Sequence, residues 1–174
     1  EESGEMRLFI GIALNSDILS TLQRIRNRFW ESCEPELSHL MCETSRNLIS
    51  WVPPQNYHCT LHFIGSVKKE KVDIIKDTIE ELMRTQNGNL RLSLEERVTT
   101  FSLNSNCAKL RVLYSPLQAA DTESNGRLET LVSNLQLQID AIFFDETVET
   151  GAKKTKKQKN SFRGHVTLAR VTDR

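Results

Sequence analysis

Apolar and polar residues alternate with the period of a β-strand between residues 57 and 63. Side chains on a strand point alternately to opposite faces. His58 and Thr60 therefore share one face, and Cys59 and Leu61 share the other. One face of this predicted strand is apolar and packs, while the other presents an imidazole beside a hydroxyl.

A second stretch near the other end of the sequence has the same order of residues. Residues 58–61 spell His-x-Thr-Leu, and residues 165–168 spell it again, so that His165 and Thr167 share a face. From average residue usage, one such match arises by chance at about one position in ten thousand. Two copies in strand-like settings therefore indicate a shared role.

Apolar periodicity predicts three amphipathic helices and several strands around these motifs. We expect Pro35, Gly65 and Pro116 to end the elements that they follow. The expected helices are residues 18–33, with an N-cap among residues 15–17, residues 69–86, and a third helix marked by Leu128, Leu131, Leu135 and Ile139. The expected strands, besides those of the two motifs, are a well-buried strand at residues 7–14, an edge strand at 48–52, and strands at 90–94 and 109–115.

The order of these elements repeats along the chain. A strand, a helix and a His-x-Thr-Leu strand at residues 7–65 are matched by a strand, a helix and a second motif strand at residues 109–170. A duplicated unit commonly packs about a pseudo-two-fold axis, which brings equivalent strands together. We therefore expect an α+β fold that forms a single bilobal domain over residues 1–174. Its two pseudo-symmetric lobes, about 6–100 and 101–174 with the termini free to cross over, would hold largely antiparallel sheets around a central groove.

Composition and charge narrow the class of protein without identifying a partner. The 174 residues are 38% apolar and 26% charged, and 23 basic residues balance 23 acidic ones. This balance gives no sign of a protein coated for nucleic acid, so attraction to phosphate must come from local clusters. The four cysteines lack metal-binding spacing, and the apolar run at residues 8–14 is too short to cross a bilayer. We expect a cytoplasmic monomer with free thiols and no membrane partner, and a nuclear location is not excluded.

Two facing histidines are equipped for acid and base catalysis. Histidine titrates near neutral pH, so one imidazole of a pair can be neutral while the other is protonated. The neutral ring takes a proton from water, and the protonated ring gives one to a leaving oxygen. The hydroxyls of Thr60 and Thr167 could hold anionic oxygens between the rings. A phosphodiester, above all a strained cyclic one, fits this slot without a metal or another cofactor.

The motif pair and the order of elements resemble the two-histidine phosphoesterase superfamily. The resemblance is to its LigT-like branch of RNA 2′,3′-cyclic phosphodiesterases, historically called 2′-5′ RNA ligases, and it extends over nearly the whole chain. The matching residues are RLFI at 7–10, WVPP at 51–54, YHCTLHFIG at 57–65, RVL at 111–113 and FRGHVTLAR at 162–170.

The resemblance implies hydrolysis of a 2′,3′-cyclic phosphate at an RNA end to a 2′-phosphate. It makes His58 the proton donor and His165 the proton acceptor, and it assigns Thr60, Thr167 and Arg170 to phosphate binding. Arg170 has the wrong alternation to share the face of His165 in a regular strand. It can therefore reach the phosphate only if the strand ends, twists or bulges.

Besides the alternation of Arg170, the sequence departs from the family pattern at two places. Gly164 stands where many relatives have proline, a small change because both residues fix how the strand begins. The loop at residues 145–161 is longer and more basic than in compact bacterial members, which leaves the preferred substrate open. Five lysines within residues 153–159 form either a solvated run or a track for an RNA backbone.

Several residues near the motifs have ordinary explanations beside the functional ones. His62 shares the alternation of His58, so it either lines the edge of the groove or is a partly exposed polar residue. Phe9 and Tyr57 could stack on a terminal base, although a place in the core is the more common role. His58 and His62 would lie about 13 Å apart along a strand, too far for one zinc ion, so we expect no metal site.

Two kinds of rival function stay open. The same slot could act on ADP-ribose cyclic phosphate or a 2′-5′ oligonucleotide, or could run in reverse as a 2′-5′ RNA ligase. Alternatively, the chain could be a nucleotide-binding module that has lost turnover. The presence of both histidines and both threonines disfavours this second alternative, because binding alone does not require two proton-transfer groups.

Overall fold

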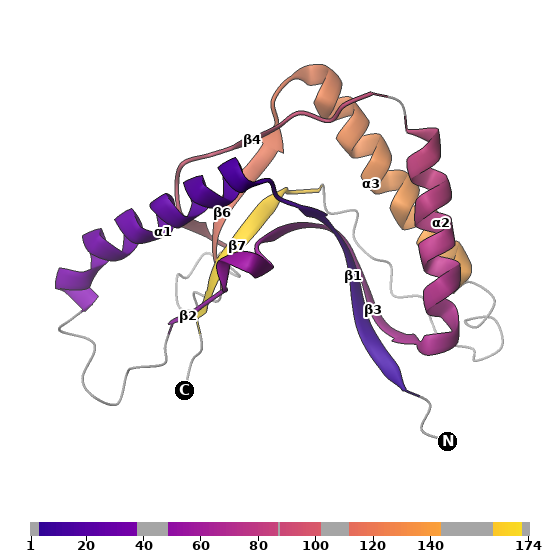
Figure 1. The fold of residues 1–174 in the computed structure, drawn as a ribbon, viewed down its shortest axis with the longest axis horizontal. Coiled ribbons are helices and arrows are strands. Elements are labelled where there is room, and N and C mark those ends of the chain that lie inside the picture. Colours follow the sequence, from indigo (N-terminus) through magenta and orange to yellow (C-terminus); the bar gives the residue numbers. More distant parts are fainter. Residues whose placement is uncertain (1–3, 38–48, 87, 102–111, 144–161, 172–174) are drawn as a thin grey trace. The chain divides into compact units, whose positions relative to one another are not determined.

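The computed structural model describes residues 4–37, 49–86, 88–101, 112–143 and 162–171 (Figure 1). The chain divides into two compact units. The first contains residues 1–11, 60–92 and 119–162, and the second contains residues 12–59, 93–118 and 163–174. Each unit is therefore built from segments that are far apart in the sequence.

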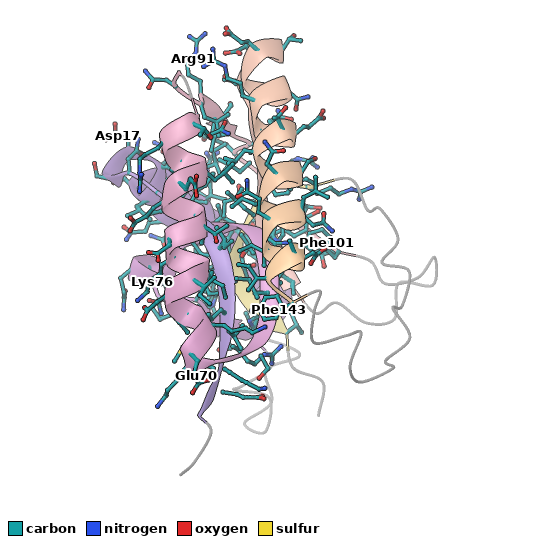
Figure 2. All side chains as sticks on the ribbon, turned by 90° about the vertical axis from the view of Figure 1, so that its right-hand side faces the viewer. Asp17, Glu70, Lys76, Arg91, Phe101 and Phe143 are labelled. Atoms are coloured by element: carbon teal, nitrogen blue, oxygen red, sulfur yellow. The ribbon has the colours of Figure 1, made fainter. Side chains whose placement is uncertain are left out.

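The first unit combines two strands with two helices. β1 (Glu5–Ala13) is hydrogen-bonded to β3 (His58–Lys68). α2 (Val72–Thr85) follows a 3-10 turn, Lys69–Lys71, and lies beside α3 (Thr122–Ile142) (Figure 2). Val67 of β3, Ile75 of α2 and Ile139 of α3 are buried together. The amphipathic patterns predicted for these two helices are confirmed.

Polar contacts hold both ends of α3. At its last turn, the Lys71 ammonium donates to the Ile142 carbonyl at 3.0 Å and lies 4.8 Å from the centroid of the Phe143 ring. A cation is favourable there because the last helical carbonyls carry partial negative charge. At the first turn, the Asp121 carboxylate accepts a hydrogen bond from the Ser124 N–H at 2.7 Å. This bond holds the pKa of the Asp121 carboxyl below its ordinary value.

β1 is less buried than the apolar run at residues 7–14 predicts, so that prediction is wrong. Among the described strands, β1 is hydrogen-bonded to β3 alone. Leu8 and Ile10 pack on the core of the unit, whereas Phe9 between them is 48% exposed. An edge strand that packs on helices through one face leaves its alternate residues uncovered.

The second unit is a sheet centred on β7 (His165–Val171), together with α1 (Ser16–Leu37). β7 pairs antiparallel with β6 (Val112–Ala119), with β2 (Ile49–Trp51) and with the start of β3. β4 (Leu92–Leu94) and β5 (Thr99–Thr100) pair with β6. Leu22 and Ile25 of α1 are buried at the spacing of one helical face.

The described residues form three α-helices and a largely antiparallel sheet, which confirms the predicted α+β class. The two lobes expected at about 6–100 and 101–174, with termini that may cross over, stay a prediction. β1, β3, β4 and β6 each contain residues of both units. No helix in the described part of the chain is long and apolar enough to cross a membrane.

Two prolines do not end the elements that contain them, contrary to the prediction. α1 continues past Pro35 to Leu37, because proline has a helical φ angle and removes only one backbone donor near the end of the helix. β6 continues through Pro116, whose carbonyl accepts a hydrogen bond from the Glu95 N–H at 2.9 Å. The N and the carbonyl of one strand residue point to the same side. The missing donor of Pro116 therefore points toward Glu95, just beyond the end of β4.

β3 likewise continues past Gly65, where the sequence predicts its end. Gly65 has a φ of +94°, a backbone conformation that residues with a side chain rarely adopt. Ile64 and Val67 both pack on the core of the first unit, although regular alternation would put residues three apart on opposite faces. Gly65 thus absorbs a change of facing within a continuous strand, as a β-bulge does.

We expect Gly65→Ala to lower the free energy of unfolding by about 1–2 kcal/mol, because an L side chain is strained at positive φ. The matched control is Gly126→Ala in α3, where an added Cβ also meets nothing within 4 Å. That control should raise the free energy of unfolding by about 0.5–1 kcal/mol, because alanine is the better helix former. Urea unfolding followed by circular dichroism measures both changes. Equal stability of Gly65→Ala and wild type would contradict this account.

Candidate active site

The pairing of β3 with β7 brings the two histidine motifs together. Cys59 lies directly opposite Val166 in this antiparallel pair, and both side chains are buried. The next residue of each strand points to the other face, and the antiparallel register sets His58 opposite Thr167. These two residues are only partly buried. The pair therefore has an apolar face that packs and a polar face that carries the motif side chains.

The two imidazoles lie on this polar face at diagonal positions. His165 precedes Thr167 by two residues in β7, so it is the diagonal neighbour of His58. Diagonal positions on one face of an antiparallel pair are about 7–8 Å apart. That separation accommodates one phosphate group in contact with both rings.

Each imidazole makes the same hydrogen bond to the backbone at the entrance of its own strand. Nδ1 of His58 lies 2.7 Å from the carbonyl oxygen of Asn56, and Nδ1 of His165 lies 2.8 Å from that of Arg163. A carbonyl oxygen only accepts hydrogen bonds, so Nδ1 of each ring carries a proton and donates it. In the neutral form of each ring, Nε2 is then the nitrogen that can accept a proton.

A short turn fixes the carbonyl that orients His58. Pro53 and Pro54 open a 3-10 turn, Pro54–Asn56, in which the Asn56 N–H donates to the Pro53 carbonyl at 2.8 Å. The fixed φ of proline suits this turn, and its missing donor is not needed there. The Pro-Pro pair of the sequence therefore presets the backbone oxygen to which the first imidazole donates.

β7 contains a bulge at Leu168, the last residue of the second motif. Tyr114 of β6 lies opposite Thr167, and the preceding residue of β6, Leu113, lies opposite Ala169. Leu168 is therefore an extra residue that β6 does not match, and Leu168 and Ala169 are both buried. One step of the alternation is lost at this point, as expected of a bulge.

The bulge brings Arg170 to the face of the second histidine. Arg170 lies opposite Val112, and Val112 shares a face of β6 with Tyr114. Because Tyr114 lies opposite Thr167, the side chains of Arg170 and Thr167 start from the same face of β7. Arg170 is also exposed. From the sequence, Arg170 could approach a phosphate bound beside His165 only if the strand ended, twisted or bulged. The structure has such a bulge, at Leu168.

Two aromatic residues that sequence reasoning missed contact His165. Phe101 and Tyr114 are stacked, with ring centroids 4.1 Å apart and 19° between their planes. The His165 ring lies 4.9 Å from Phe101 at 83°, and 5.3 Å from Tyr114 at 67°. Tyr114 lies in a strand that the sequence predicts. Thr99 and Thr100, just before Phe101, favour a strand only weakly, because they are two β-forming residues without a longer pattern. The contact itself depends on the pairing of β5 with β6, which periodicity does not specify.

The other predicted residues on β1 and β3 belong to the first unit. Thr60 follows His58 by two residues on β3 and is partly buried, as is His62. Phe9 is not in the core, although a core position is the more common role for a phenylalanine in a strand. It packs instead on Phe63, itself 68% exposed, with ring centroids 6.2 Å apart.

Burial raises the pKa of two groups that lie on the apolar side of the motif strand. Tyr57 is 4% exposed, so it belongs to the core and cannot stack on a base. Burial raises the pKa of its hydroxyl, and the nearby Arg26 guanidinium partly offsets the increase. Burial also raises the pKa of the Cys59 thiol, with a partial offset from the backbone N–H of His165. A thiol of this kind stays protonated and unreactive at neutral pH.

Several expectations fall on residues outside the described ranges. These are the lysine run at residues 153–159 and two of the four cysteines, Cys42 and Cys107. Cys33 and Cys59, which are described, are free thiols. No group of three or more His, Cys, Asp and Glu side chains in the described ranges could hold a metal ion.

Comparisons with known proteins found a family model that matches part of the chain and solved structures that match most of it. The family model described as LigT like phosphoesterase matches residues 31–94, which include the first motif. No curated protein matches the chain. Among solved structures, TT0787 of Thermus thermophilus matches with a TM-score of 0.63 and 21% identity, over 97% of this chain and 76% of that chain. E. coli LigT complexed with NADP+ (20% identity) and with 3′-AMP (19% identity) each match with a TM-score of 0.58, over 96% of this chain and 73% of LigT.

The family model matches only part of the chain, and the solved structures share its fold. The matched segment contains His58 and Thr60, two of the residues on which the resemblance in the motifs rests. In this LigT-like fold both motif histidines occupy one face of a single strand pair.

We expect the neutral forms of His58 and His165 to carry their proton on Nδ1, because that atom of each ring donates to a backbone carbonyl. NMR spectra that correlate the ring nitrogens with the ring hydrogens distinguish this tautomer from the Nε2–H form. The variants His58→Gln and His165→Gln assign the signals. An Nε2–H tautomer in either neutral ring would contradict the geometry described above.

Proposed function

We propose that the protein hydrolyses 2′,3′-cyclic phosphates at RNA ends to 2′-phosphates, without a metal, through His58 and His165. The observation that carries this proposal is the register of β3 and β7, in which the two imidazoles are diagonal neighbours on one face. Their matching Nδ1 contacts support Nε2 as the atom of each ring that would transfer the proton. A pair of such atoms on either side of one phosphate is the equipment for concerted acid and base catalysis.

In the proposed reaction His165 is the general base and His58 is the general acid. Nε2 of neutral His165 accepts a proton from a water molecule while the water oxygen forms a bond to phosphorus. The bond from phosphorus to the 3′-oxygen breaks, and Nε2 of protonated His58 gives its proton to that oxygen. The product has a 3′-hydroxyl and a 2′-phosphate. Proton exchange with solvent then returns His165 to its neutral form and His58 to its protonated form.

The remaining motif residues would bind the phosphate. Thr60 and Thr167 supply hydroxyl donors, and Arg170 supplies a positive charge and several N–H donors that suit the phosphate oxygens. These donors gain strength as negative charge grows on the oxygens in the transition state. The bulge at Leu168 supports this role of Arg170, because it turns the strand so that Arg170 starts from the face of Thr167.

The comparisons support a nucleotide substrate for this site. E. coli LigT has been crystallised in complexes with 3′-AMP, with ATP and with NADP+, which are all nucleotides. RNA with a cyclic phosphate end presents a nucleotide at its terminus, and we propose it as the partner. Incubation with a short RNA ending in a 2′,3′-cyclic phosphate, and identification of the oxygen that keeps the phosphate, tests the proposal directly. ADP-ribose cyclic phosphate, a 2′-5′ oligonucleotide and pairs of RNA ends for ligation complete the substrate panel.

We expect His58→Ala and His165→Ala each to lower kcat on a cyclic-phosphate RNA by about 10²–10⁴-fold, which is the usual contribution of a general acid or base. The two losses should not add in the double variant, because each ring needs the other to complete the proton transfers. Initial rates of 2′-phosphate formation measure these effects, and circular dichroism checks that the variants are folded.

The dependence of this rate on pH is a second test of the two-histidine mechanism. Since one ring must be neutral while the other is protonated, the rate should pass through a maximum and fall on both sides. A rate that rises steadily through neutral pH, or full activity in either alanine variant, would count against the two-histidine mechanism.

Replacing Arg170 should weaken the reaction without abolishing it. We expect Arg170→Met to lower kcat/KM by about 10- to 100-fold, the equivalent of losing one charge-assisted hydrogen bond. Arg170→Lys should recover part of the loss, because it restores the charge without the planar fork. The matched control is Arg24→Met, since Arg24 forms an exposed ion pair with Glu96 at 3.1 Å. Equal rates for Arg170→Met and Arg24→Met would remove Arg170 from the site.

A further inference from the structure

We infer that Phe101 and Tyr114 are positioning residues that hold the imidazole plane of His165 in the orientation needed for proton transfer. The inference rests on the proposed function, in which His165 is the general base. Neither aromatic residue is part of the two His-x-Thr-Leu motifs. Both contact the His165 ring directly, so their effect on the reaction would pass through that ring.

The distances among the three rings define how they meet. Phe101 and Tyr114 are stacked nearly parallel with centroids 4.1 Å apart. If the imidazole of His165 pointed at the outer face of one aromatic ring, its distance to the centroid of the second ring would be much larger than its distance to the first. Instead the two centroid distances from His165 are similar, 4.9 Å and 5.3 Å, and both angles are steep. The imidazole therefore lies beside the stack and meets both aromatic rings along their edges, within the usual range of aromatic contacts.

This contact restricts a torsion that is otherwise soft. The χ2 angle of histidine has a broad distribution, so the ring plane is not fixed by the side chain itself. Rotation of the His165 ring out of its plane would drive its atoms into the stacked pair. A half-turn would keep the plane but would take Nδ1 away from the carbonyl of Arg163. The stack and the hydrogen bond are thus complementary, and together they leave one direction for Nε2.

Strand pairing builds this support from two places in the chain. Tyr114 lies opposite Thr167 on one side and opposite Thr99 of β5 on the other. Phe101 follows Thr99 by two residues, so the short strand β5 delivers its ring to the same face as Tyr114. The contacts of Tyr114 with Phe101 and with His165 are contacts between rings. We therefore assign the positioning effect to the aromatic rings alone.

The effect should appear in kcat rather than in KM. A general base works only when its acceptor atom is within hydrogen-bond reach of the proton, and a displacement of about 1 Å can cost about 100-fold. We expect Phe101→Leu and Tyr114→Leu to lower kcat by about 10- to 100-fold, and KM to stay within about twofold because the phosphate ligands remain.

Conservative variants separate positioning from general packing. Tyr114→Phe keeps the ring and should retain kcat to within about twofold, and Phe101→Tyr should do the same. Leu137→Ala, at a 69% exposed position on α3, is the control for a surface substitution. A Tyr114→Phe variant as slow as Tyr114→Leu would overturn the assignment to the ring. A rise in KM at unchanged kcat would overturn positioning and would indicate direct contact with the substrate.

NMR of the His165 ring nitrogens tests the inference without turnover. In the wild type we expect one neutral tautomer, with the proton on Nδ1, and in the leucine variants a mixture of both tautomers. An unchanged single tautomer together with unchanged kcat would overturn the inference. If the wild type turns over no cyclic phosphate, the proposed function fails, and the NMR comparison still decides whether the stack holds the ring. If both leucine variants fail to fold, Phe101→Met, which keeps apolar volume without a ring, carries the same two measurements.

Discussion

The candidate site depends on one antiparallel register, in which Cys59 lies opposite Val166. Both of these side chains are buried, so a slip of one residue in either strand would turn His58 or His165 toward the apolar side. Burial of an imidazole without hydrogen-bond partners is costly, so such slipped pairings are disfavoured. The apolar packing that stabilises the strand pair therefore also selects the register that aligns the two histidines. Fold stability and site geometry come from the same contact.

With this register and a regular β7, the side chain of Arg170 would start from the face opposite to that of His165 and Thr167. Between Thr167 and Arg170 a regular strand reverses facing, and the extra residue Leu168 cancels that reversal. The bulge has little cost on the apolar side, because Leu168 and Ala169 are both buried there. A bulge beside a site is a common way to redirect a side chain, and here it gathers an imidazole, a hydroxyl and a guanidinium within one strand.

Much of the fold could be predicted from the sequence, because an apolar stripe on a helix or strand is a local signal. Pro116 and Gly65 were wrongly predicted to end their strands, and the reason is physical. Pro116 is tolerated because its missing donor points past the end of β4, and Gly65 is tolerated because its positive φ lets a strand change facing. Neither condition is visible until the neighbouring strand is known. The contact of Phe101 with Tyr114 was missed for the same reason, since only the pairing of β5 with β6 creates it.

The two histidine motifs divide their requirements between local and long-range structure. Each imidazole donates to the carbonyl of the residue two positions before it, so this contact is local to each copy of the motif. What a motif cannot supply is the distance to the other ring, and only the pairing of β3 with β7 fixes that distance. A carbonyl two residues before the histidine can accompany each copy of the motif and make the same contact each time. The fold then has to provide the register between the two copies and, at His165, the stacked rings of Phe101 and Tyr114.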